Sequence, residues 1–342
     1  MMSYRITTNG VFRNYRANLQ KNTLKLNDAM TRVETQRNFN SFAEDPAAAS
    51  EAFQLRRAYW RTGDEINTSN HVISKFSAAY AALDPIIDGD QDTPSLSSID
   101  AAIRGVTDTA ANGRAALGVQ IQTISEAIVG LMNSQYEGDY IFAGADGANV
   151  PFTWSDDKKT LYYRGVDVTD AAAIEAAGLN DEPLFVDIGL GFREDAGGEL
   201  IESTGFDMSL SGAQLLGYGE DKNLAVMLHE LGDIFARSDP STGAYETPED
   251  RERAFELVGK VSRGIDDMIQ RHVELSTETH FLRTNLDQLE STKQIVNEQI
   301  ERVESMDAAQ AITEMTWAQY CYNAALRIGN NILSQSLIDY MN

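Results

Sequence analysis

The chain has 342 residues, 42% of them hydrophobic, so it is long enough for two or three domains and apolar enough to bury a core. Its 52 acidic residues against 28 basic ones give a formal charge of -24, which opposes binding to nucleic acid and electrostatic docking on anionic membranes. Its single cysteine, Cys321, excludes an internal disulfide framework.

The N-terminus has no apolar stretch of the kind that forms a cleavable secretory signal. No segment approaches the roughly 20 consecutive apolar residues of a membrane-spanning helix. We therefore expect neither a cleaved signal nor membrane insertion, while export with an uncleaved N-terminus stays open.

Long stretches without proline permit long helices, since an interior proline costs about 3 kcal/mol. Three such stretches precede residue 150, and each carries apolar residues at helical spacing on one face only. The predicted seams are Phe12, Tyr15, Leu19, Asn22, Leu26, Ala29 and Val33; then Ala52, Leu55, Tyr59, Thr62, Ile66, Ser69, Ile73, Phe76, Tyr80 and Leu83; then Ile99, Ile103, Val106, Ala110, Gly113, Leu117, Ile121, Ile124, Ile128 and Leu131. Because one-sided helices are poorly stable alone, we expect them to pack together.

Between about residues 140 and 215 the hydrophobic period changes and glycine becomes frequent. Aromatic and β-branched residues bounded by turn residues predict short strands there. We expect a strand at Asp139–Gly144, a hairpin of Phe152–Trp154 with Leu161–Tyr163, a short helix at Asp170–Ala177 and a strand at Pro183–Gly189. This segment therefore reads as a small β-rich domain inserted between two helical halves.

The most regular pattern lies near the C-terminus, where apolar residues recur every three and four positions over six heptads. A helix of that length would run about 60 Å, which favours packing against other long helices over an enzyme core. The predicted seam is Val261, Ile265, Met268, Leu275, Leu282, Leu286, Leu289, Val296, Ile300 and Val303. Three polar residues, His272, Thr279 and Lys293, occupy a positions of this seam. They either fix the register of the pairing or face solvent on one side of the bundle.

After Val303 the seam should continue at Asp307, but the apolar row resumes one residue later, at Ala308. A joint between two helices would produce this slip, and so would one helix with a small register adjustment. The sequence leaves both readings open.

Several segments resemble the flagellin family, and in particular its hook–filament junction members. The acidic-proline-alanine turn at Ser41–Ala49 resembles the segment that follows the first helix of the family. Tyr136–Gly144, with Pro151-Phe152 shortly after, resembles the entry into the outer domain of the junction members. Val303–Met315 resembles the C-terminal signature of the family, and Ser336–Met341 resembles the end of a junction member.

The resemblance implies a mainly α fold with a β-rich insert, in which long terminal helices form a coiled-coil or helical-bundle rod. Residues 1–35 and 308–342 would be the terminal assembly domain, 36–139 and 216–307 the helical rod, and 140–215 the outer insert. The terminal segments would gain burial only by packing on neighbours, so we expect them to be mobile in an isolated monomer. The expected assembly residues are Tyr15, Leu19, Leu26, Val33, Met315, Ala318, Tyr322, Ala325, Ile332 and Leu333.

By the same resemblance, the protein would be a structural subunit of the bacterial flagellum that joins hook to filament. Its partners would be further copies of itself, the preceding hook-associated junction protein, flagellin and an export chaperone, with no nucleic acid and no membrane insertion. It would lie outside the cell, exported by the flagellar type III apparatus without a cleavable signal. A filament-forming flagellin is the nearest alternative, and a cytosolic coiled-coil adaptor or chaperone is a more distant one.

No motif in the chain supports catalysis, a cofactor or a metal. Asp88–Asp92 begins like a calcium loop, but its sixth and twelfth positions are Thr93 and Ile99 rather than glycine and glutamate. His229-Glu230 lacks the second histidine of a zinc protease helix, so we expect a surface helix cap or an exposed helix face there. Cys321 has no base near it in sequence, so a packing role is favoured over a reactive thiol. An enzyme within residues 140–215 is the remaining and least favoured reading.

Overall fold

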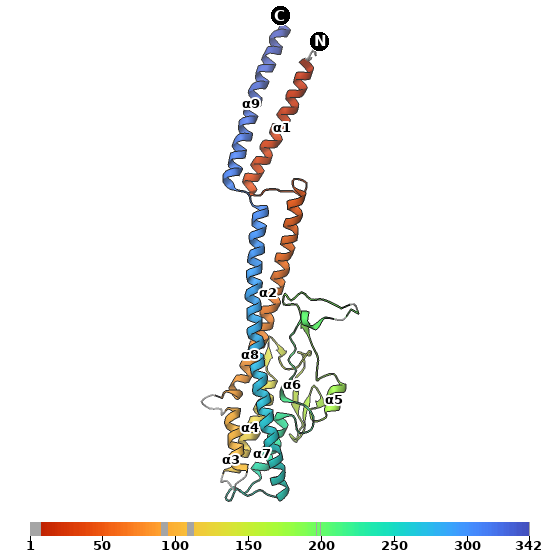
Figure 1. Cartoon of the computed structure of the whole chain (residues 1–342), viewed down its shortest axis with the longest axis vertical. Helices are drawn as coiled ribbons and strands as arrows, with labels where there is room; N and C mark the ends of the chain where they lie inside the picture. The colour runs from red at the N-terminus through yellow and green to blue at the C-terminus, as the bar shows by residue number, and fades with distance from the viewer. Residues whose placement is uncertain (1–7, 90–94, 108–112, 196, 199, 342) are drawn as a thin grey trace. The chain divides into compact units, whose positions relative to one another are not determined.

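The computed structural model describes residues 8–89, 95–107, 113–195, 197–198 and 200–341, with side chains from residue 10 to residue 330. The fold is mainly helical, with long helices toward both termini and a small central β region of short antiparallel sheets (Figure 1). The chain divides into two compact units. Unit 1 comprises residues 1–63 and 290–342, and unit 2 comprises residues 64–289.

Helices make up the long elements of unit 1 among its described residues, and one isolated β-bridge joins Arg37 to Ser305. The unit contains two whole helices, the start of a third and the end of a fourth. These are α1 (Thr8–Thr35), the first part of α2 (Pro46–Ile87), the last part of α8 (Pro248–Glu304) and α9 (Ala308–Met341). The slip in the C-terminal seam is therefore a joint, because α8 ends at Glu304 and α9 begins at Ala308.

An aspartate begins the helix after each of the two connections in unit 1. The Asp45 carboxylate accepts hydrogen bonds from the backbone amides of Ala47 and Ala48 at 3.1 and 3.0 Å, just before α2. The Asp307 carboxylate accepts from Ala309 and Gln310 at 2.7 and 3.4 Å, just before α9. An acidic N-cap satisfies amides that have no partner within the helix and favours the dipole. The acidic-proline-alanine turn read in the sequence is thus the start of α2.

Unit 2 holds the rest of α2 and α8 together with five shorter helices and one 3₁₀ turn. These are α3 (Leu96–Thr107), α4 (Arg114–Met132), α5 (Ala171–Ala176), α6 (Gly212–Leu216), α7 (Leu224–Ala236) and the turn Glu202–Thr204. The predicted seam over residues 99–131 is divided between two helices, α3 and α4, and its member Ala110 lies outside the described residues. The first helix ends at Thr107, and Gly113, with φ 105°, precedes the next one. Only glycine adopts such a φ without strain.

The strands of unit 2 form three small antiparallel sheets. They are β1 (Gln135–Tyr136) with β2 (Asp139–Tyr140); β3 (Phe152–Trp154), β4 (Leu161–Tyr163) and β5 (Val166–Asp167); and β6 (Phe185–Val186) with β7 (Phe206–Asp207). The predicted hairpin is confirmed, with Thr153 opposite Tyr162. The other two predicted strands are shorter than expected. After Tyr140 the chain enters the core, where Ile141 and Phe142 are buried instead of continuing the ladder.

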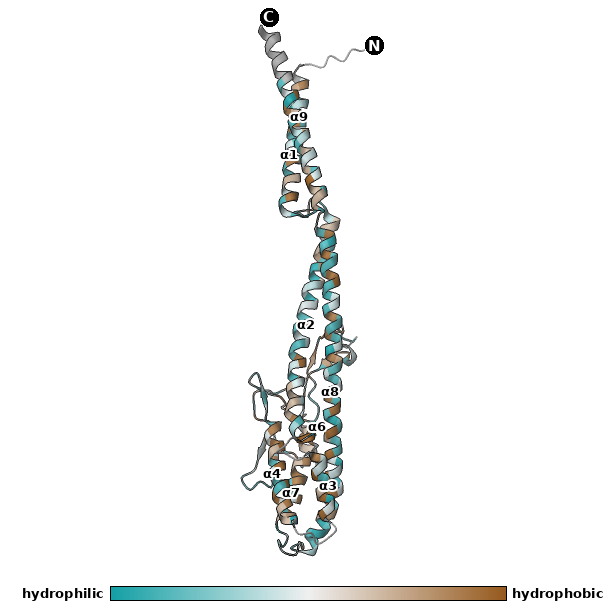
Figure 2. Ribbon diagram, turned by 90° about the vertical axis from the view of Figure 1, so that its left-hand side faces the viewer, coloured by the Kyte–Doolittle hydropathy of each residue, from teal (hydrophilic) through white to brown (hydrophobic). Residues whose placement is uncertain are grey.

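The core of unit 2 is gathered around α4 and α7, which cross closely (Figure 2). Two glycines permit the approach. A Cβ on Gly118 would lie 2.3 Å from the Ala236 amide nitrogen, and one on Gly232 would lie 2.9 Å from the Gly118 carbonyl oxygen. Within the described residues, α4 is the one helix long and apolar enough to cross a membrane. Its apolar residues Ile121 and Ile128 are fully buried in this core, and that packing accounts for its composition.

Candidate assembly interface

Helices α1 and α9 of unit 1 lie side by side and antiparallel (Figures 1 and 2). The ring of Tyr15 rests on Gly329, where an added Cβ would lie 1.9 Å from the Tyr15 hydroxyl oxygen. Nearer the joint, the Arg32 guanidinium lies 4.0 Å from the Glu314 carboxylate. These two pairs set the register of the helices against each other.

Most of the residues predicted for assembly lie on this pair of helices within the described side chains. Eight of them are half-buried in the structure: Tyr15, Leu19, Leu26, Val33, Met315, Ala318, Tyr322 and Ala325. The other two, Ile332 and Leu333, lie outside the residues whose side chains are described. Half-burial is what a two-helix pair provides, because a helix with one neighbour leaves the flanks of its seam in solvent. A shallow groove of about 290 Å³ between the helices includes Cys321.

Below this pair, the two connections of unit 1 are bonded to each other. The Asn38 amide donates to the Glu304 carbonyl at 2.8 Å, and the Met306 amide donates to the Gln36 carbonyl at 3.1 Å. The Asn38 side chain also donates to the Val303 and Ser305 carbonyls. The carbonyls left open at the end of α8 are thereby satisfied by the loop that precedes α2. Hydrogen bonds therefore hold the connection between α8 and α9 in a defined conformation against the connection between α1 and α2.

Unit 1 leaves large apolar side chains in solvent. Among the described residues, every large hydrophobic side chain that is more than 60% exposed belongs to unit 1, namely Leu24, Phe42, Phe53, Trp60, Trp317 and Tyr320. The rings of Trp317 and Tyr320 stack on each other at 5.8 Å on the outside of α9. Phe42 and Phe53 line a groove of about 220 Å³ beside the joint. A concentration of exposed aromatic residues in one part of a chain marks a surface that another protein covers.

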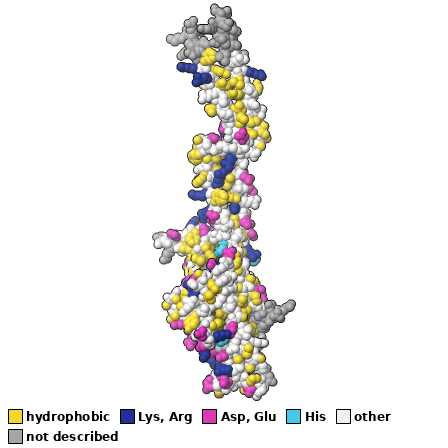
Figure 3. Space-filling view, turned by 180° about the vertical axis from the view of Figure 1, so that it is seen from behind, with side chains coloured by type: hydrophobic (Ala, Val, Ile, Leu, Met, Phe, Trp, Pro, Cys, Tyr) yellow, Lys and Arg dark blue, Asp and Glu magenta, His cyan; other side chains and the backbone are white. Residues whose placement is uncertain are grey.

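The formal net charge also differs sharply between the two units. Unit 2 holds 40 of the 52 acidic residues and 15 of the 28 basic ones, a formal charge of -25. Unit 1 holds the other 12 acidic and 13 basic residues, a formal charge of +1. On the face drawn in Figure 3, Lys and Arg side chains lie among hydrophobic ones over unit 1. Copies of unit 1 can approach one another without net repulsion, whereas copies of unit 2 repel.

Residues 6–146 match the family described as the bacterial flagellin N-terminal helical region. Over this part of its length the chain is flagellin-like. This likeness indicates a structural role in the flagellum.

Solved structures are similar to this flagellin-like chain in fold. One is a Vibrio parahaemolyticus protein provisionally assigned as flagellar hook-associated, with 14% identity and a TM-score of 0.55, covering 77% of this chain and all of its own. Two others are FlgL of Bacillus cereus (16% identity, TM-score 0.40, 75% of this chain and 99% of its own) and FlgL of Xanthomonas campestris (12%, 0.43, 73% and 99%). No match was found among curated protein sequences.

The α8 seam of the flagellin-like protein faces inward along its whole predicted length. The residues from Val261 to Leu289 lie in unit 2, where Val261, Ile265, Met268, Leu275, Leu282 and Leu289 are buried and Leu286 is half-buried. In unit 1, Val296, Ile300 and Val303 are half-buried.

The three polar residues of this seam have different surroundings. His272 is only 5% exposed and stacks on Tyr80 of α2 at 4.1 Å, so solvent exposure does not explain it. The Thr279 hydroxyl donates to the Leu275 carbonyl. The Lys293 ammonium lies 5.0 Å from the centre of the Tyr59 ring, beside the space that Gly63 leaves open. His272 and Lys293 thus contact α2, as residues that select a register would.

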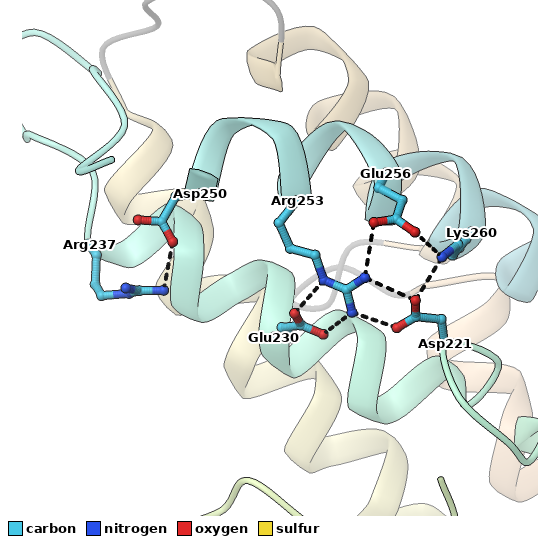
Figure 4. Close-up of polar contacts among 7 residues, drawn as sticks. All are labelled: Asp221, Glu230, Arg237, Asp250, Arg253, Glu256 and Lys260. Atoms are coloured by element: carbon cyan, nitrogen blue, oxygen red, sulfur yellow. Dashed lines mark hydrogen bonds and ion pairs between the residues drawn. The ribbon is translucent and has the colours of Figure 1, made fainter. Parts of the chain in front are cut away.

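A network of charged side chains in unit 2 attaches α7 and the loop before it to α8 (Figure 4). Arg253 of α8 donates to both oxygens of Asp221 and both of Glu230, at 2.5 to 2.9 Å. Lys260, seven residues further along α8, also donates to Asp221 at 2.7 Å. The Arg253 hydrogen bonds, with those of Lys260, hold the pKa of Asp221 well below its usual value. The flagellin family pattern did not signal this network, which depends on tertiary contacts.

The candidate metal and catalytic residues that the structure describes do not come together in one site. Within the described ranges, no cluster of three His, Cys, Asp or Glu residues could hold a metal ion. Of the calcium-like run, Asp90–Asp92 lies outside the described residues. His229 is half-buried and packs its ring 5.1 Å from that of Trp154; burial lowers its pKa. This corrects the expectation of an exposed surface position.

Proposed function

We propose that this protein is a subunit of the hook–filament junction of the bacterial flagellum, of the hook-associated protein 3 type, and that it assembles through unit 1. The observation that carries the proposal is the concentration in unit 1 of all the described large hydrophobic side chains that are more than 60% exposed. Covering a buried aromatic side chain removes on the order of 150–250 Å² from water. Assembly therefore supplies the burial that a single copy of unit 1 lacks.

The charge distribution supports the same arrangement. Unit 1 is almost neutral, so neighbouring copies lose little electrostatic energy on close packing. Unit 2 carries the whole net negative charge, which keeps the unassembled protein soluble and favours an outward position for this unit in the assembly. In this proposal, residues 1–35 and 308–342 form the assembly domain, 36–139 and 216–307 the helical domain, and 140–215 the outer insert.

The proposed partners follow from this position in the flagellum. Copies of the chain contact one another, the preceding hook-associated junction protein lies on one side, flagellin lies on the other, and a chaperone holds the terminal helices before export. The protein acts outside the cell, is exported without a cleavable signal and has no enzymatic role. Before assembly, α1 and α9 gain little burial from each other, because their paired residues are only half-buried.

Two measurements test the proposal. Amide exchange on the dilute monomer should be fast in α1 and α9 and slow in the α4–α7 core; strong protection of both terminal helices would contradict the proposed dependence on neighbours. Seeded polymerisation separates the junction subunit from the nearest alternative. A junction subunit adds to hook ends and stops, whereas continued growth into long filaments would identify a flagellin of the filament.

A further inference from the structure

The outer face of α2 in unit 1 carries exposed aromatic residues with an arginine between them. Phe53 and Trp60 are 68% and 70% exposed, and Arg57 between them is exposed as well. Residues 53, 57 and 60 recur at helical spacing, so they share one face. This face, here called the α2 stripe, lies opposite the residues Leu55, Tyr59 and Thr62 that pack inward.

The α2 stripe is basic as well as aromatic. Arg57 forms no ion pair with any residue that the structure describes, whereas its neighbour Arg56 is engaged by Glu304 at 2.5 Å. In the part of α2 that belongs to unit 1, Arg56, Arg57 and Arg61 outnumber the single acidic residue, Glu51. A partner of the α2 stripe should therefore combine an apolar centre with acidic flanks.

The same unit carries a surface of that kind on its other long helix. Ile295 of α8 is 50% exposed, and Glu298 and Glu301 beside it are exposed. These residues, here called the α8 stripe, lie on the side of α8 away from the inward seam residues Val296 and Ile300. Arg302 is also exposed near this surface, and its side chain donates to the Glu298 carbonyl oxygen at 3.3 Å. The Glu298 carboxylate accepts a hydrogen bond from the Gln294 amide at 3.3 Å, and the Glu301 carboxylate accepts one from the Asn297 amide at 3.0 Å. Neither carboxylate forms an ion pair with a residue that the structure describes, so both keep their negative charge for a partner.

We propose that the α2 stripe of one copy packs against the α8 stripe of the next copy in the assembly. Charge complementarity selects this pairing, because two α2 stripes would bring Arg57 close to Arg57, and two α8 stripes would bring glutamates together. Every copy carries both surfaces, so the contact is heterologous. Heterologous contacts repeat around a closed ring or along a helix. This inference rests on the proposed function, in which unit 1 is the part that assembles.

Charge reversal in the full-length chain tests the contact. Uptake of the purified chain onto flagellar hook fragments that end in the preceding hook-associated junction protein is measured by sedimentation over a concentration series. Arg57→Glu and Glu298→Arg should each raise the concentration needed for half-maximal uptake by about ten-fold or more, since like charges face each other. The double variant Arg57→Glu/Glu298→Arg should recover most of this loss. Arg283→Glu makes an equal charge change on the exposed surface of unit 2, and this variant should be taken up onto the hook fragments at the same concentration as the wild type.

Disulfide trapping provides a direct second measurement in a Cys321→Ser background. Trp60→Cys and Ile295→Cys chains are mixed, allowed to assemble on the hook fragments and then oxidised. A disulfide requires the two Cβ atoms to come within roughly 4 Å, and the two cysteines are on different molecules. The mixed dimer should form in preference to either homodimer.

The outcomes separate the contact from the proposed function. Wild-type uptake with unchanged uptake of Arg57→Glu, or with no recovery in the double variant, overturns the contact and leaves the proposed function in place. Absence of wild-type uptake overturns both. Circular dichroism and melting of each variant must match the wild type, because the substituted positions are exposed and do not contribute to the core.

Discussion

Replacement of Gly118 by alanine should weaken unit 2, although alanine is the better helix former. The added Cβ would lie 2.3 Å from the Ala236 nitrogen and 2.6 Å from the Gly232 carbonyl oxygen, both of them backbone atoms. Ordinary contact would require α7 to withdraw by roughly 1 Å, which opens gaps in the surrounding core. Overpacking of this kind costs about 1–3 kcal/mol.

Gly130, on the same helix, provides the matched control. It is exposed, and an added Cβ would meet nothing within 4 Å. Both substitutions gain about 1 kcal/mol of helix propensity, so the difference between the two variants isolates the close approach of α4 and α7. We expect Gly130→Ala to be more stable than Gly118→Ala by about 1–3 kcal/mol in urea unfolding followed by circular dichroism. Equal stabilities, within about 0.5 kcal/mol, would refute the described crossing.

Three further substitutions test other parts of the structure. Gly329→Leu should displace the Tyr15 ring and abolish uptake onto hook fragments without changing the unfolding of unit 2, whereas Gly259→Leu, at a position with open space, should assemble normally. Lys293→Leu should stabilise the α2–α8 pairing in unit 1 by about 1 kcal/mol while relaxing partner choice, and a clear loss of stability in thermal unfolding would reject a register role. Asp221→Asn should destabilise unit 2 by about 1–2 kcal/mol at neutral pH. Because the pKa of Asp221 is depressed on folding, its contribution is complete above roughly pH 4 and is lost as pH falls through the folded pKa. The gap between Asp221→Asn and wild type in urea unfolding should therefore narrow below that pH, and a constant gap would contradict the network in Figure 4.

The long helices and their inward faces could be predicted from the sequence because helical periodicity is a local signal. The predicted seam residues between Val261 and Val303 recur at spacings of three and four, and all of them are buried or half-buried in the structure. The hairpin of Phe152–Trp154 and Leu161–Tyr163 was also readable, since a polar turn separates two aromatic runs. The break between α3 and α4 was missed, because the apolar spacing continues through Gly113 as if the helix did.

The outward surfaces could not be predicted in the same way. Phe53, Trp60 and Phe42 do not belong to any inward seam, and their sequence neighbours give no reason for their exposure. Only the position of α8 shows which face of α2 stays in solvent. The Arg253 network likewise joins residues that are 23 and 32 positions apart, so no local pattern marks it. Trp317 and Tyr320 had one visible signal, an unusual aromatic content for the terminal helix.

In the proposed assembly, unit 1 is complete only when it packs against other molecules. Deletion of residues 308–342 tests this directly, with unfolding of unit 2 and uptake onto hook fragments measured on the same preparation. We expect a folded monomer whose main unfolding transition is unchanged and whose uptake is lost. A truncated chain that still adds to the flagellar tip would contradict the account.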